Sequence, residues 1–181
     1  FNIGIEGGCA IDKDSQGIYI TGQSGNNNSA TTSSSFTAAY DFNGNLLWQT
    51  QPFGGVGSIP TAGTSIAADG LGNVYTVGLA YTGGPAAFPI VVKHTNTGTT
   101  VWESKLVDQY GVLPLDINIG SDGYIYITGE SIAPNFSQLW WGKMDTDGNL
   151  LFQRFFSGEW AGTDGNISLS GHRMSKVHQD K

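Results

Sequence analysis

Four aromatic side chains are the clearest candidates for ligand contact in this sequence of 181 residues. They stand outside the repeated positions of the chain, in or beside variable inserts: Trp140, Trp141, Trp160 and Tyr81. An exposed ring of this kind among polar neighbours suits contact with a sugar or with a protein surface. We therefore predict these four as ligand-binding residues, with core packing as the competing interpretation. Because side chains alternate along a strand, one of Trp140 and Trp141 is expected to face out of its sheet.

Signals for metal binding and catalysis are weaker. Asp12-Lys13-Asp14 resembles the start of a calcium loop, but Gln16 stands where a third ligand belongs, and a β-turn is the competing interpretation. No histidine has a partner at metal-ligand spacing, and no H-E-x-x-H or G-x-S-x-G string occurs. Carboxylates for glycoside cleavage are available, although no pair is defined: Asp69, Asp108, Asp116 and Glu130. We predict no catalytic residue and no cofactor, with calcium at Asp12 and Asp14 as an alternative.

Composition argues against several classes of partner. Eight Lys and Arg against 15 Asp and Glu give a net charge of −7, without the clustered cations that bind nucleic acid or anionic membrane surfaces. The apolar runs are far shorter than the ~20 residues of a membrane-spanning helix. A single cysteine, Cys9, excludes an intrachain disulfide. We expect neither nucleic-acid binding nor membrane insertion, and the abundant Ser, Thr, Asn and Gly with little Lys favour an extracellular or cell-surface location.

A repeat of about 50 residues organises the chain and must position these side chains. Three segments share a central tyrosine: Gly17–Gly22, Asn73–Gly78 and Tyr124–Gly129. A second shared element follows each of them, with an aromatic residue four positions after a turn glycine: Trp48, Trp102 and Phe152. Because the position of these aromatics is fixed by the repeat, we predict that Trp48 and Trp102 pack between neighbouring repeats.

Within each repeat the apolar pattern has period two and is broken by Asp-Gly, Asn-Gly and Thr-Gly turns, which predicts four short antiparallel strands. Small four-stranded sheets arranged radially form a β-propeller. We therefore predict an all-β chain of four-stranded antiparallel blades. The expected repeats cover residues 1–56, 57–106 and 107–157, with a partial fourth repeat or polar tail at 158–181.

The repeated string A-x-D-x-x-GN-V/I-Y-x-x-G … K-x-D-x-x-G-x-x-x-W resembles the bacterial β-propeller family with seven-bladed-propeller-type repeats. It is more weakly similar to the propeller repeats of quinoprotein dehydrogenases, whose metal and cofactor contacts have no visible counterpart here. The resemblance covers roughly Gly7 to Phe156 and implies the fold, but it says little about activity because propellers host unrelated functions.

Three repeats are too few for a closed propeller, which typically has about 4–8 blades. The sequence therefore predicts a partial ring, completed either by homo-oligomerisation or by further blades of a larger chain. We expect a non-enzymatic secreted or cell-surface module that acts in binding or assembly, with a protein or glycan as its ligand. A lectin-like carbohydrate-binding propeller and a fragment of a propeller enzyme, quinoprotein-like or glycan-cleaving, are the alternatives.

Overall fold

The computed structural model describes residues 5–25, 34–51, 61–81, 87–106, 111–133 and 136–156. All regular structure in these ranges is β-strand. The strands are β1 Ile5–Lys13, β2 Ile18–Gly25, β3 Ser34–Tyr40, β4 Leu46–Thr50, β5 Thr61–Ala68, β6 Asn73–Tyr81, β7 Ala87–Thr95, β8 Thr100–Lys105, β9 Val112–Ile119, β10 Ile125–Ala133, β11 Phe136–Met144 and β12 Leu150–Phe156. Among the residues described, no helix has the length and apolar character needed to span a membrane.

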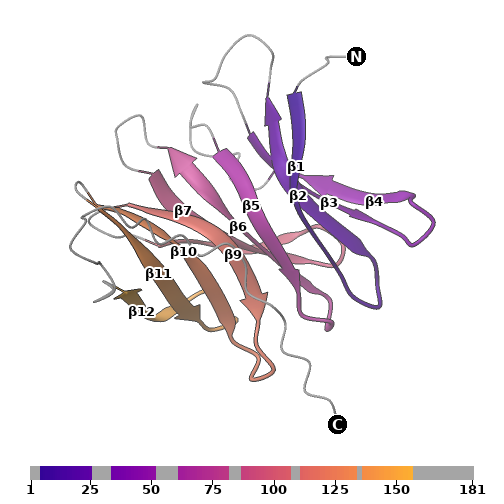
Figure 1. Ribbon diagram of the computed structural model, residues 1–181. Coiled ribbons are helices and arrows are strands. Elements are labelled where there is room, and N and C mark those ends of the chain that lie inside the picture. The colour runs from indigo at the N-terminus through magenta and orange to yellow at the C-terminus, as the bar shows by residue number, and fades with distance from the viewer. Residues whose placement is uncertain are drawn as a thin grey trace.

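The strands form three four-stranded antiparallel sheets, each made of consecutive strands: β1–β4, β5–β8 and β9–β12. We call these sheets blades 1, 2 and 3. Blade 2 lies between the other two, and its first strand β5 contacts both β1 and β9, the first strands of its neighbours (Figure 1). The prediction of an all-β chain built from repeated four-stranded antiparallel sheets is confirmed, and the arrangement is propeller-like.

The last hairpin of each blade is held by the repeated turn. Asp41 accepts hydrogen bonds from the backbone N–H groups of Asn43 (2.9 Å) and Asn45 (2.8 Å), and Asp145 makes the same contacts in blade 3. The glycine that ends each of these two turns has a positive φ, +83° at Gly44 and +91° at Gly148, which glycine adopts without steric cost. The interpretation of these Asp-containing stretches as β-turns is confirmed.

Each pair of adjacent blades is joined by one tryptophan. Trp48 of β4 donates its indole N–H to the carbonyl oxygen of Asn96 in the β7–β8 turn, at 2.6 Å. The ring lies against Gly98, where an added Cβ would sit 2.8 Å from it. Trp102 of β8 repeats this contact with Thr146 (3.0 Å) and Gly148 in blade 3. The prediction that Trp48 and Trp102 pack between repeats is confirmed.

The hydrophobic core lies between the blades. One buried cluster joins blades 1 and 2 through Tyr19, Ala39, Ile66, Ala68 and Val74. A larger cluster joins blades 2 and 3: Ala67, Tyr75, Val77, Val91, Leu106, Val112, Ile117, Ile125, Ile127, Trp140 and Met144. Each sheet therefore buries its apolar side chains against the next sheet.

The tryptophan contact can be tested by filling the space over Gly98. Asparagine tolerates a positive φ, so Gly98→Asn acts mainly through the clash of its Cβ with the Trp48 ring. We expect a loss of about 2 kcal/mol in the free energy of unfolding, measured by urea denaturation. Gly70→Asn is the control, because Gly70 has a similar φ of +74° and open space around its Cβ. Equal effects of the two substitutions would contradict the tryptophan contact.

His94 is buried at the junction of blades 1 and 2. It occupies the position of Tyr40 and Met144 in the other blades, and its ring centroid lies 6.0 Å from that of Trp48. Nδ1 is 3.4 Å from the Thr100 hydroxyl, while Nε2 has no hydrogen-bond partner. Burial lowers the pKa of His94 from 6.5 to about 4, because the charged imidazolium is poorly solvated there.

This depressed pKa predicts a loss of stability in mild acid. Between pH 6.5 and about 4 the unfolded chain binds a proton at His94 that the folded chain does not, so the free energy of unfolding falls as the pH falls through this window. The loss should reach up to about 3 kcal/mol. His94→Met introduces the residue found at this position in blade 3. It should remove the His94 contribution to the pH dependence of the free energy of unfolding, measured by urea denaturation across the pH range. Parallel pH dependences of the two proteins would disprove the role of His94.

Candidate functional site

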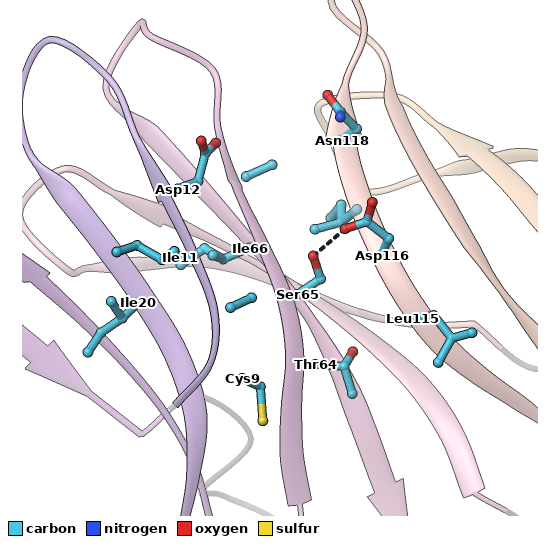
Figure 2. Close-up of a pocket in the computed structure, with 13 residues that line it drawn as sticks. Cys9, Ile11, Asp12, Ile20, Thr64, Ser65, Ile66, Leu115, Asp116 and Asn118 are labelled. Carbon is cyan, nitrogen blue, oxygen red and sulfur yellow. Dashed lines mark hydrogen bonds between the residues drawn. The ribbon is translucent and has the colours of Figure 1, made fainter. Parts of the chain in front are cut away.

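The first strands of the three blades line a hollow of about 450 Å³ (Figure 2). Each strand contributes the same four repeat positions, which are Cys9–Asp12 of β1, Thr64–Ala67 of β5 and Leu115–Asn118 of β9. Ile20 of β2 completes the lining. The hollow is therefore a product of the repeat, since three equivalent segments converge on it.

A β-bulge at the same place in each first strand positions these segments. The register shifts between Gly8 and Ala10 in β1, between Gly63 and Ser65 in β5, and at Leu115 in β9. One extra residue bends a strand and re-aims the side chains beside it. The repeated bulge thus places one bulge residue per blade, and the three residues that follow it, at the hollow; the bulge residues are Cys9, Thr64 and Leu115.

Two hydrogen bonds between blades organise the polar groups of the hollow. The Ser65 hydroxyl of blade 2 donates to Oδ1 of Asp116 in blade 3 at 2.6 Å (Figure 2). Oδ2 of Asp12 in blade 1 accepts from the backbone N–H of Ala68 in blade 2 at 2.9 Å. These bonds fix both carboxylates relative to the blade between them.

The remaining lining sets the chemistry of the hollow. Thr64 and Asn118 add further polar groups, and the partly exposed Leu115 adds apolar surface. None of the described residues that line it is Lys or Arg. Carboxylate oxygens accept hydrogen bonds and donate none, so the two carboxylates favour a ligand that carries donors or positive charge.

The structure separates the predicted aromatic residues. Trp140 is fully buried between blades 2 and 3, and its indole N–H donates to Oε1 of Gln153 at 3.0 Å. Trp141 lies on the opposite face of blade 3, half-buried, with its ring perpendicular to that of Phe152 at 5.1 Å between centroids. Tyr81 ends β6, but its side chain lies outside the described part of the chain, as does all of Trp160.

The acidic candidates also have separate roles. Oδ1 of Asp14 accepts from the N–H groups of Gln16 (2.7 Å) and Gly17 (3.2 Å) and from the Tyr19 hydroxyl (3.2 Å), while Asp12 faces blade 2. Burial and the neighbouring Asp14 raise the pKa of Tyr19 to about 12, so its hydroxyl remains a donor. In the ranges the structure covers, no three His, Cys, Asp or Glu side chains gather as metal ligands would.

The other carboxylates of the glycoside-cleavage alternative are dispersed among the elements. Asp69 closes the β5–β6 turn by accepting from the N–H groups of Leu71 and Asn73, and Glu130 lies on β10. Asp116 lies at the hollow, and Asp108 falls outside the described residues.

From the sequence, Asp12 was a candidate calcium ligand and Asp116 a candidate carboxylate for glycoside cleavage. Thr64, Ser65 and Asn118 were not predicted as site residues. The available signal was the offset from the repeated tyrosine: Asp12, Ala67 and Asn118 pair directly with Tyr19, Tyr75 and Tyr126. Aligning the repeats on that tyrosine would have grouped these positions.

Comparison of the chain with protein-family models gave no match, and comparison with curated proteins gave none either.

The Ser65–Asp116 bond can be measured by a double-mutant cycle. Ser65→Ala and Asp116→Ala should each lower the free energy of unfolding, and the double variant should lose less than the sum because one interaction is removed only once. We expect a coupling energy of about 1–2 kcal/mol, since one partner is a carboxylate. Additive losses in urea denaturation would show that the two side chains do not interact.

Proposed function

We propose that this chain is a non-enzymatic propeller-type binding module that holds a small ligand bearing hydroxyl or amine groups in the hollow between β1, β5 and β9. The observation that carries the proposal is the convergence of three equivalent strand segments on one hollow with two carboxylates in its lining. A secreted or cell-surface location belongs to the same proposal and rests on the composition of the chain.

The polar groups favour a donor-rich ligand. Asp12 and Asp116 offer acceptor oxygens, and Asn118 offers both a donor and an acceptor. The net charge of −7 attracts cationic ligands over a longer range. Sugars and small amines both fit this description, because their hydroxyl or ammonium groups donate hydrogen bonds while their carbon atoms contact Leu115.

The same groups suit binding better than nucleophilic catalysis. The Ser65 hydroxyl donates a hydrogen bond to Asp116, and no histidine is among the described residues of the lining to act as a general base near neutral pH. The bonds from Asp12 to blade 2 and from Ser65 to blade 3 hold the lining in place before a ligand arrives. Such preorganisation lowers the entropic cost of binding.

Cys9 provides a direct probe of the hollow. It is the single cysteine of the chain, it is exposed, and it lies in the lining. We expect at least one member of a panel of neutral sugars and small amines to slow the alkylation of Cys9 by a maleimide. Calorimetric titration of that compound should show affinity lowered about tenfold by Asp116→Asn, because a hydrogen bond to a charged group contributes at least about 1.4 kcal/mol.

Asp147→Asn is the matched control, because it makes the same charge change at an exposed turn away from the hollow. Its affinity for the compound should equal that of the unaltered protein. The proposal fails if no compound in the panel protects Cys9, or if Asp116→Asn and Asp147→Asn affect affinity alike.

A further inference from the structure

The two junctions inside this chain are built in the same way, which defines two faces on every blade. The leading face carries a cross-strand row that covers the next blade: Tyr19, Ala39 and Trp48 in blade 1, Tyr75, Lys93 and Trp102 in blade 2, and Tyr126, Lys143 and Phe152 in blade 3. The receiving face is the opposite side, which in blade 2 presents Ile66 and Val74 to blade 1. The leading face of blade 3 and the receiving face of blade 1 are the two that no described sheet covers.

The receiving face of blade 1 is apolar and open. Ile11 is 69% exposed, whereas its equivalents Ile66 and Ile117 are 5% and 2% exposed beneath a neighbouring blade. The same contrast holds along the rest of the face. Three further side chains are only partly buried although their equivalents in blades 2 and 3 are buried: Ile18, Ile20 and Tyr40.

The turn of blade 1 has an empty place for an aromatic ring. Gly44 has the same φ of +83° as Gly98, but no atom of the described structure lies within 4 Å of the Cβ position at Gly44. At Gly98 and Gly148 that space is filled by Trp48 and Trp102 of the preceding blade. We call the space over Gly44 the blade 1 socket.

The leading face of blade 3 carries the matching parts. Phe152 stands where Trp48 and Trp102 stand, and Lys143 stands where Lys93 donates to the carbonyl of Thr146 in the next blade, at 3.3 Å. Tyr126 is partly exposed, whereas its equivalents Tyr19 and Tyr75 are 2% and 0% exposed. The face also presents Trp141, whose ring meets Phe152 edge to face.

We propose that the leading face of blade 3 docks onto the receiving face of blade 1 of a second copy of this chain, so that two copies close a six-bladed ring. Phe152 of one copy enters the blade 1 socket of the other, and Lys143 reaches the carbonyl of Phe42, the turn position equivalent to Thr146. The phenylalanine side chain has no N–H to donate, unlike an indole, so Lys143 supplies the polar contact at this junction.

Three observations favour a second copy as the occupant. Both halves of the missing junction are present on one chain, so two copies form two identical junctions and leave neither face open. Six blades fall within the range of about 4–8 found in closed propellers. The leading face of blade 3 carries Arg154 and Lys143, the latter also paired with Asp122 of its own blade at 3.0 Å, and the turn of the socket carries Asp41. This assembly does not depend on a ligand in the hollow.

Light scattering after gel filtration tests the assembly. The unaltered chain should have twice its mass of 19.2 kDa. Ile11→Asp places a carboxylate on the receiving face, and Gly44→Asn fills the socket; both should raise the dimer dissociation constant by at least about a hundredfold and give the monomer mass. Their far-ultraviolet circular dichroism should match that of the unaltered chain, since Ile11 is exposed and the Cβ position of Gly44 is open in the described part of a copy.

Gly70→Asn is the control, because Gly70 has a φ of +74° with open space at its Cβ but belongs to the β5–β6 turn of blade 2, away from both open faces. It should remain a dimer. A folded monomer from the unaltered chain would overturn the proposal and favour further blades in a longer protein as the occupant. A dimer that survives both Ile11→Asp and Gly44→Asn would overturn it too, because the copies would then meet through another surface.

Discussion

The contact on which this structure depends is the seating of an indole ring from one blade over a turn glycine of the next. Trp48 and Trp102 each combine a hydrogen bond to a turn carbonyl with close packing on Gly98 and Gly148, where an added Cβ would sit 2.8 Å and 3.0 Å from the ring. A single four-stranded sheet has two faces and cannot bury both alone, so stability comes from stacking. Trp48 and Trp102 also pack against the buried clusters that join the blades.

The hollow is a consequence of the same geometry. Stacked blades bring their first strands together, and the bulge repeated in each strand places equivalent residues side by side. Variation among repeats then gives those positions different chemistry. One repeat position holds Ala10, Ser65 and Asp116, and another holds Asp12, Ala67 and Asn118, so a single backbone design yields an asymmetric polar lining. The repeat supplies the frame, and substitution within it supplies specificity.

The sequence predicts the strands, turns and stacking aromatics well, because each depends on local pattern: period two, turn glycines and an aromatic at a fixed offset. The bulges are different. Cys9, Thr64 and Leu115 share no side-chain type, and an extra residue in a strand appears only once pairing partners are known. The two adjacent tryptophans show the same limit. Alternation places Trp140 and Trp141 on opposite faces, but which one is buried depends on blade 2 covering Trp140.

The most direct test of the repeated junction is a crystal structure of the species that the chain forms in solution. It should contain a six-bladed ring of two copies, with Phe152 of each copy seated over Gly44 of the other and Ile11 buried. A structure in which Ile11 stays open to solvent, or in which a surface other than the leading face of blade 3 covers it, would contradict the view that one repeated junction determines both the fold and its assembly.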